Sequence, residues 1–277
     1  MKPNQKVILI TGASSGIGYD AAKTLVGEGH IVYVAARRVQ NMEPLRELGC
    51  TPLKLDITRE EDIQEVVNTI LQAQQTIDVL INNAGFGLYG PVEEITIEEA
   101  RYQFEVNLFG LARLTQLLIP TMRQQGSGTI INMSSIGGKI YAPMGAWYHA
   151  TKHALEGWSD SLRTELASFG INVVLIEPGA IQSEFGDVMA KPMVEKHGSG
   201  PYRDLVSGLN EAQRKEYEGG GGSHPRVISR VIAEAIHASK PKTRYAAGKY
   251  AAPLLFIRRW FSDRFFDRII MSMVKAT

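Results

Sequence analysis

The stretch VILITGASSGIG, residues 7–18, decides the first unit of the fold. Its first five residues are apolar or β-branched, which is typical of a buried strand. Glycines follow at positions 12, 16 and 18, and a helical pattern then continues through Val26. A strand, a glycine loop and a helix in this order bring backbone N–H groups and a helix N-terminus up to a phosphate. The spacing G-x-x-x-G-x-G differs from the common dinucleotide fingerprint, and glycines also serve turns that bind nothing. The stretch favours a phosphate-binding turn.

Strand and helix patterns alternate along the rest of the chain. Apolar strand-like runs lie at 31–36, 51–55, 77–85, 128–135 and 172–177, with helix patterns at 41–48, 59–74, 98–122 and 145–169. A helix at 225–238 and a last strand at 243–247 follow. Strands that alternate with helices pair in parallel, so the pattern predicts an α/β fold with a doubly wound sheet. At 277 residues, the chain is near the upper end for one hydrophobic core.

Composition and charge exclude several classes of protein. Hydrophobic residues make up 44% of the chain and the net charge is +1, so no overall field attracts nucleic acid or an acidic membrane. The single cysteine, Cys50, permits no internal disulfide and is expected to be a small buried apolar side chain. The N-terminus lacks the pattern of a signal peptide, and no segment approaches the roughly 20 apolar residues that span a bilayer. A cytoplasmic location is therefore expected.

The end of the second strand bears on the choice of cofactor. An acid at this position would hydrogen-bond the adenosine ribose and repel a 2′-phosphate. This chain instead has Ala36, Arg37 and Arg38, and a guanidinium suits a phosphate by charge and by its planar fork of donors. Ser14 in the glycine loop is a possible further donor. The pattern favours NADP over NAD, and the alternative is that both arginines are solvated surface residues.

Tyr148 and Lys152 are four residues apart in a segment with helical character, so their side chains share one face. A free tyrosine has a pKa of about 10, and a nearby ammonium lowers that value toward neutrality. Ser135 ends the preceding strand, where its hydroxyl is placed to hold a carbonyl oxygen while Tyr148 supplies the proton. The alternative is an exposed helix face without chemistry.

Two further motifs are ambiguous taken alone. The strand that ends in Asn82-Asn83-Ala84-Gly85 offers small residues and amides where a flat ring can approach the backbone, although such a turn can also be purely structural. Asn107 lies in an apolar helical setting, where an amide is more often structural than catalytic.

These motifs, followed by Pro178-Gly179, occur in the order of one family. With thirteen residues from Ser135 to Tyr148, the chain resembles the short-chain dehydrogenase/reductase family over roughly residues 6–183. The resemblance implies a single Rossmann-type domain over residues 1–277, a seven-stranded parallel sheet with helices on both faces, and a nicotinamide cofactor. The KPKTRY stretch at 240–245 and the tail after it are nearest the hydroxysteroid and retinol dehydrogenase branch.

The resemblance also implies roles for individual residues. Tyr148 is the general acid/base, Lys152 lowers the tyrosine pKa and binds the nicotinamide ribose, Ser135 orients the substrate oxygen, and Asn107 supports a water-linked proton relay. Position 183 is commonly threonine in the family; Ser183 keeps the hydroxyl expected to contact the nicotinamide amide but lacks the methyl that fixes its rotamer. The expected cofactor contacts are Gly12, Ser14, Ser15, Gly16, Ile17, Gly18, Arg37, Arg38, Asp56, Ile57, Asn83, Ala84, Gly85, Tyr148, Lys152, Pro178, Gly179, Ile181 and Ser183.

Substrate binding is expected in a mobile segment, residues 182–222, which includes four consecutive glycines. His197 within it is expected at the surface, and no metal site is predicted because no partner ligands surround it. An apolar and aromatic lining favours a bulky hydrophobic carbonyl or alcohol over a sugar. The residues expected to form that lining are Phe86, Leu88, Tyr89, Ala142, Met144 and Trp147.

The tail at 250–277 mixes aromatic and aliphatic residues with arginines. An amphipathic extension that packs on its own domain or a sister subunit is favoured over one that contacts a membrane surface. The family commonly forms homodimers or homotetramers through the helices at 98–122 and 145–169. The leading expectation is an NADP(H)-dependent oxidoreductase that interconverts a carbonyl and an alcohol on a hydrophobic substrate. The alternatives are an NAD-linked steroid- or retinol-type dehydrogenase and a cofactor-binding regulatory protein without turnover.

Overall fold

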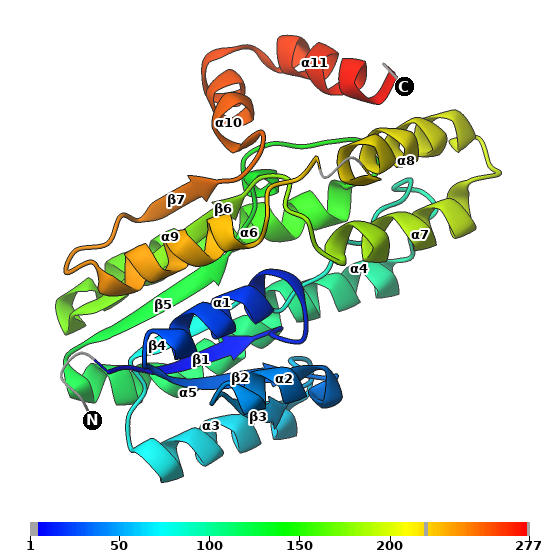
Figure 1. The fold of residues 1–277 in the computed structure, drawn as a ribbon. Coiled ribbons are helices and arrows are strands. Elements are labelled where there is room, and N and C mark those ends of the chain that lie inside the picture. Colours follow the sequence, from blue (N-terminus) through cyan, green and yellow to red (C-terminus); the bar gives the residue numbers. More distant parts are fainter. Residues whose placement is uncertain (1–4, 219–220, 276–277) are drawn as a thin grey trace.

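A computed structural model describes residues 5–218 and 221–275 (Figure 1). Seven parallel strands form one sheet in the order β3-β2-β1-β4-β5-β6-β7, which confirms the predicted Rossmann-type architecture. The strands are β1 Val7–Thr11, β2 Ile31–Ala36, β3 Thr51–Lys54, β4 Val79–Asn82, β5 Gly128–Met133, β6 Ile171–Pro178 and β7 Arg244–Ala247. The helices are α1 Gly16–Gly27, α2 Glu43–Glu47, α3 Glu60–Gln74, α4 Ile97–Phe104, α5 Gly110–Gln125, α6 Ala146–Leu166, α7 Phe185–His197, α8 Arg203–Glu218, α9 Arg226–His237, α10 Ala251–Trp260 and α11 Asp263–Lys275.

The side chains of each strand alternate between two separate hydrophobic cores. Ile8 and Ile10 of β1 face the side covered by α1 and α9, whereas Val7 and Leu9 face the side covered by α3, α5 and α6. All four side chains are fully buried. Because helices cover both faces, the central strands are continuous apolar runs rather than alternating ones.

The strand order places a crevice at the carboxyl ends of the central strands. β1 pairs with β2 on one side and with β4 on the other, so the chain leaves β1 and β4 in opposite directions. In open α/β sheets, ligands bind in the crevice outside the carboxyl ends of the strands at such a switch point. The topology therefore gathers the loops after β1, β2, β4, β5 and β6 around one site.

Three segments differ from the sequence-based expectation. Residues 83–85, expected in a strand, form the loop after β4. The single helix expected at 98–122 is instead α4 and α5, joined by a π-helical turn at Glu105–Phe109. The expected mobile segment 182–222 contains α7 and α8; its Gly219 and Gly220 lie outside the described residues, and its mobility stays a prediction.

The tail forms two helices that pack on the rest of the chain. Leu254 of α10 and Phe266 and Ile270 of α11 are buried against the loop at 136–142, which follows β5. Figure 1 shows both helices beyond the end of β7, with α11 beside α8. The α8–α11 approach is close, because a Cβ at Gly208 would lie 2.7 Å from the carbonyl oxygen of Val274.

Candidate active site

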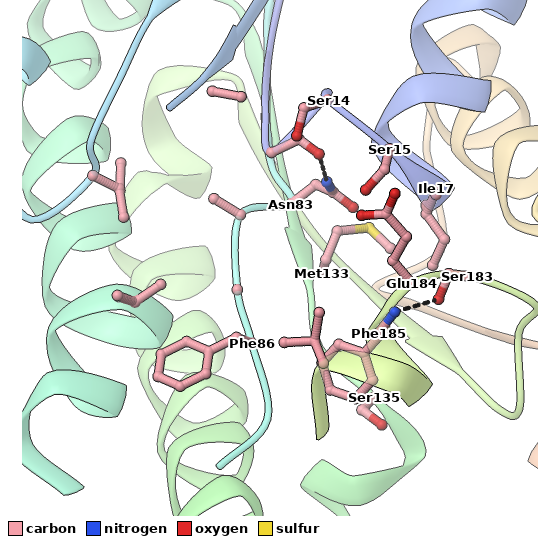
Figure 2. Close-up of a pocket in the computed structure, with 18 of the residues that line it drawn as sticks. Ser14, Ser15, Ile17, Asn83, Phe86, Met133, Ser135, Ser183, Glu184 and Phe185 are labelled. Atoms are coloured by element: carbon pink, nitrogen blue, oxygen red, sulfur yellow. Dashed lines mark hydrogen bonds between the residues drawn. The ribbon is translucent and has the colours of Figure 1, made fainter. Parts of the chain in front are cut away.

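A cavity of about 640 Å³ lies at the carboxyl ends of the strands, between the glycine loop and the start of α7. Figure 2 shows Ser14 and Ser15 on one side of it, Ser135 on the other, and Ser183 beside Ile17. The cavity is lined by most of the residues predicted to bind cofactor or substrate: Gly12, Ser14, Ser15, Gly16, Ile17, Arg37, Arg38, Asp56, Ile57, Asn83, Ala84, Gly85, Ser135, Tyr148, Lys152, Pro178, Gly179, Ile181 and Ser183. Gly18 and Asn107 do not line it.

The glycine loop is shaped as a cradle that side chains would fill. Gly12 has φ +68° and Gly16 has φ +58°, a region that favours glycine. A Cβ on Gly12 would lie 2.8 Å from the Cα of Ala84, and one on Gly16 would lie 3.2 Å from the Cβ of Ser183. The Ser15 side chain makes no capping hydrogen bond to α1, and Ser15, Gly16 and Ile17 line the cavity, so the first N–H groups of the helix are left for a ligand there. The loop thus fits a dinucleotide pyrophosphate.

Asn83 holds the loop after β4 against the glycine loop. Its Nδ2 donates to the carbonyl oxygens of Thr11 (2.9 Å) and Gly12 (3.1 Å), and its backbone N–H donates to the Thr11 hydroxyl (3.1 Å). Gly18 lies behind this contact, because a Cβ there would be 2.5 Å from Asn83 Nδ2. Gly18 therefore shapes the cradle by close packing, and its predicted cofactor contact stays a prediction.

Tyr148 and Lys152 lie on one face of α6, as predicted, and both side chains are buried. The Lys152 Nζ donates to the carbonyl oxygen of Met133 at the end of β5 (2.8 Å). Burial lowers the pKa of Lys152 to about 8, while the carboxylate of Glu156, one turn further along α6, acts in the opposite direction. The ammonium is thus held at the wall of the cavity that Tyr148 also lines.

Ser135 and Tyr148 approach each other around Gly137. The Ser135 hydroxyl oxygen accepts a hydrogen bond from the Gly137 N–H (3.0 Å), and a Cβ on Gly137 would lie 3.1 Å from the Tyr148 ring. His149 fixes the loop from the other side: its Nδ1 bonds the Gly137 carbonyl, and its Nε2 accepts from the Ala142 N–H. These bonds require the neutral imidazole, and burial lowers the pKa of His149. This role of His149 was not foreseen from the sequence.

Asn107 lies in the π-helical turn and is completely buried. Its Oδ1 accepts from the Phe86 N–H (3.0 Å), and its Nδ2 donates to the Phe86 carbonyl (2.9 Å) and the Thr151 hydroxyl (3.1 Å). A Cβ on Gly85 would lie 3.1 Å from Asn107 Oδ1 and 3.8 Å from Lys152 Nζ. Asn107 therefore holds the loop after β4 beside Lys152, and its part in a proton relay stays a prediction.

The arginines after β2, Arg37 and Arg38, also line the cavity. Arg37 donates to the Tyr102 hydroxyl (3.3 Å), and Arg38 reaches the Ser14 hydroxyl (3.4 Å). Arg38 also pairs with Glu184 at the start of α7 (2.9 Å). The Arg38 guanidinium lowers the pKa of Glu184, with a further hydrogen bond from Ser15, so this carboxylate is ionised. Glu184 was not foreseen, because nothing local in the sequence links residue 184 to residue 38.

The expected substrate wall is partly wrong. Phe86 and Tyr89 line the cavity, whereas Leu88, Ala142, Met144 and Trp147 do not. Met144 packs with Met193 and Val206, and Ala142 packs against the tail. Their places are taken by α7 residues, Phe185, Val188 and Met189. Met193 of α7 and Val206 of α8 cover Met144.

The expectation that His197 lies at the surface is also wrong. Its side chain is 8% exposed, and its Nδ1 lies 2.6 Å from Glu94 Oε2. The ring packs on Gly90, where a Cβ would lie 2.7 Å from Nε2. A lone histidine in sequence cannot reveal a carboxylate partner 103 residues away. Cys50, by contrast, is buried as predicted, and burial raises the pKa of its thiol to about 11.

One histidine cluster lies near the amino ends of β1 and β2, whereas the cavity lies at the carboxyl ends of the strands. Glu28, His30 and His237 bring their ligand atoms within 4.8 Å of one another. However, His30 Nδ1 accepts the Lys6 N–H (3.2 Å), so its neutral ring carries the proton on Nε2, the atom that faces the cluster. A protonated nitrogen does not bind a metal ion, and the cluster is not connected with the cavity.

Comparison with known proteins agrees with this site. The model of the family described as short chain dehydrogenase matches residues 6–192. The 3-ketodihydrosphingosine reductase of Bacteroides thetaiotaomicron is 37% identical over 261 residues, which cover 93% of this chain and 94% of that protein. A closed structure of serine dehydrogenase with NADP+ has a TM-score of 0.76 at 26% identity, covering 87% of this chain and 94% of that one. The 3-ketoacyl-(acyl-carrier-protein) reductase of Brucella melitensis, solved with NADH, has a TM-score of 0.72 at 28% identity, and the match covers 86% of this chain and 94% of that one.

The chain belongs to the short-chain dehydrogenase/reductase family. Within that family it is an oxidoreductase that acts on CH–OH groups and interconverts alcohols and carbonyls. Along the described ranges, no helix is long and apolar enough to cross a membrane.

Proposed function

We propose that this protein is an NADP(H)-dependent carbonyl reductase or alcohol dehydrogenase for a bulky hydrophobic substrate. One observation carries the proposal. Ser135, Tyr148 and Lys152 line the same cavity as Arg37, Arg38 and Ser14. A single site thus offers both acid–base groups and phosphate-binding groups.

A nicotinamide cofactor held in this cavity would supply the hydride exchanged with the carbon of the substrate. The protein positions the substrate oxygen and moves its proton. In the reductive direction, the Ser135 hydroxyl donates to the carbonyl oxygen, where negative charge grows in the transition state. The Tyr148 hydroxyl gives its proton to that same oxygen, and the Lys152 ammonium stabilises the phenolate that remains. In the oxidative direction, the phenolate takes the proton back.

The arginines support a preference for NADP(H). Arg38 is held near the Ser14 hydroxyl, so a 2′-phosphate placed between them would receive a guanidinium and a hydroxyl donor. The solved relatives were obtained with either NADP+ or NADH, so the preference rests on these side chains. Replacing Arg38 by Gln should weaken NADPH binding roughly 10- to 100-fold, the loss of a hydrogen bond to a charged group. NADH binding should change little.

The lining near Tyr148 supports a hydrophobic substrate. The rings of Tyr89 and Phe185 lie 5.7 and 5.6 Å from that of Tyr148, and Val188 and Met189 extend the apolar wall along α7. A relative named for reducing 3-ketodihydrosphingosine, a long-chain ketone, is consistent with this class. The closer resemblance to hydroxysteroid and retinol dehydrogenases stays a prediction.

The test is a panel of steroid, aromatic and long-chain carbonyls assayed by oxidation of NADPH and of NADH. We expect turnover with NADPH on apolar substrates. Tyr148→Phe should lose at least about 10²-fold in kcat while it still binds cofactor. Tyr141→Phe is the matched control, because the Tyr141 hydroxyl bonds Asp267 outside the cavity. A preference for NADH would favour an NAD-linked dehydrogenase, and no turnover on any substrate would favour a regulatory protein.

A further inference from the structure

The corner between α10 and α11 exposes a cluster of aromatic side chains. Phe256, Trp260, Phe261 and Phe265 are 60%, 66%, 45% and 39% exposed. The rings form two contacting pairs, with centroids 6.5 Å apart for Phe256 and Trp260 and 4.7 Å apart for Phe261 and Phe265. Single exposed apolar residues are normal, whereas a contiguous group marks a surface that binds something.

This exposure persists although the tail is already docked. Phe266 and Ile270 of α11 are buried against the loop at 136–142, so the amphipathic face of the helix has its partner. Phe261 and Phe265 are additional apolar residues that this packing does not cover. We call Phe256, Trp260, Phe261 and Phe265, together with the exposed Arg259, Arg264 and Arg268, the α10–α11 corner.

The α10–α11 corner carries a net positive charge. Asp263 pairs with Arg258, and Asp267 accepts a hydrogen bond from Tyr141 while it keeps its negative charge. The tail at 250–277 has four arginines and two acids, so positive charge is in excess. Arg259, Arg264 and Arg268 have no ion pair to an acid among the described residues, and Arg259 lies 5.5 Å from the Trp260 ring. The surface therefore combines aromatic rings with unneutralised guanidinium groups.

This combination favours an anionic lipid surface over a second copy of the chain. In a two-fold dimer the same patch meets itself, so the arginines of one copy would approach those of the other. At a bilayer, the rings insert at the headgroup level while the arginines contact lipid phosphates. No described helix spans a membrane, so the contact would be peripheral.

We propose that the α10–α11 corner is a membrane-docking surface, on which Phe256, Trp260, Phe261 and Phe265 insert at the interface and Arg259, Arg264 and Arg268 bind anionic headgroups. The same helices cover the loop that follows Ser135. Docking here therefore brings the substrate end of the molecule to the lipid. The proposal rests on this surface alone and stands or falls independently of the reaction.

The test is co-sedimentation of the full chain with vesicles of phosphatidylcholine, alone or with phosphatidylglycerol at about three to one. We expect binding to the anionic vesicles, a weaker interaction in about 0.5 M salt, and a blue shift of Trp260 fluorescence. Replacing Arg264 and Arg268 by Gln should lower the partition coefficient roughly 30-fold. Trp260→Ser with Phe265→Ser should abolish binding without changing the circular dichroism spectrum.

The matched control is Arg123→Gln with Phe169→Ser. This pair is also an arginine 5.8 Å from an exposed aromatic ring, but it lies away from the tail. It should leave vesicle binding unchanged. The proposal is overturned if the wild-type chain does not bind anionic vesicles, or if the control pair weakens binding as much as the corner variants. It is also overturned if the Trp260 and Phe265 changes instead dissociate a dimer in light scattering, since a second copy would then be the occupant.

Discussion

Replacing Glu184 by Gln should increase the selectivity of the protein for NADPH over NADH. The Glu184 carboxylate lies 2.9 Å from Arg38, the guanidinium expected to receive the 2′-phosphate. To bind that phosphate, Arg38 must give up or share its pair with Glu184. NADH has no 2′-phosphate and does not require Arg38 to be released.

The magnitude follows from the exposure of the pair. The two side chains are 51% and 53% exposed, and ion pairs of this kind contribute about 0.2–1 kcal/mol. The ratio of the dissociation constants for NADH and NADPH should therefore rise roughly 1.4- to 5-fold in Glu184→Gln. A change at the neighbouring pyrophosphate site affects both cofactors and cancels in this ratio. The effect should shrink in about 0.5 M salt, where exposed charges are screened.

The assay is fluorescence titration of both cofactors against wild type, Glu184→Gln, Arg38→Gln and the double variant. With Arg38 replaced, the Glu184 change should no longer alter the ratio, because the two substitutions act through one pair. Glu43→Gln is the matched control, since Glu43 pairs with Arg46 at the same 2.9 Å and similar exposure but does not line the cavity. A ratio that is unchanged or lower in Glu184→Gln refutes the reasoning, as does an equal rise in the Arg38→Gln background.

Two further predictions concern stability. Gly12→Ala should lower the free energy of unfolding by more than about 1 kcal/mol, because it adds left-handed strain and a Cβ 2.8 Å from backbone. Gly29→Ala has the same strain at φ +89° with open space around the Cβ, so urea denaturation should show a smaller loss there. Burial and the nearby Glu156 raise the pKa of Glu177 to about 7 from 4.5, outweighing Arg244 at 3.3 Å. The folded state then binds more protons than the unfolded state between these values, so stability should fall as pH rises from about 4.5 to 7. Urea midpoints of Glu177→Gln should fall less over this range than those of wild type, and equal slopes would contradict the reasoning.

Local patterns in the chain were sufficient for the sheet and the catalytic end of the site. Alternating apolar runs specify buried strands and the helices between them, and their order leaves few topologies. Spacing also placed Tyr148 and Lys152 on one face, because four residues make about one helical turn. The same local logic failed for the helix at 98–122, since no residue type signals a π-helical turn.

Contacts between distant segments were not predictable from local patterns. The Glu94–His197 pair and the Arg38–Glu184 pair join residues 103 and 146 positions apart, so neither leaves a periodic trace in the chain. The substrate wall was assigned wrongly at Met144 for the same reason, because Met193, which packs on Met144, lies in a distant part of the chain.

The sequence by itself determined the strand–glycine loop–helix unit, the parallel sheet and the acid–base pair, since backbone preference and helical spacing act over a few residues. Only the tertiary structure decided which side chains close the cavity, which carboxylate meets Arg38 and which aromatic residues of the tail stay exposed. The physical reason is that burial and ion pairing depend on what packs across a distance, and the folded chain alone brings those groups together.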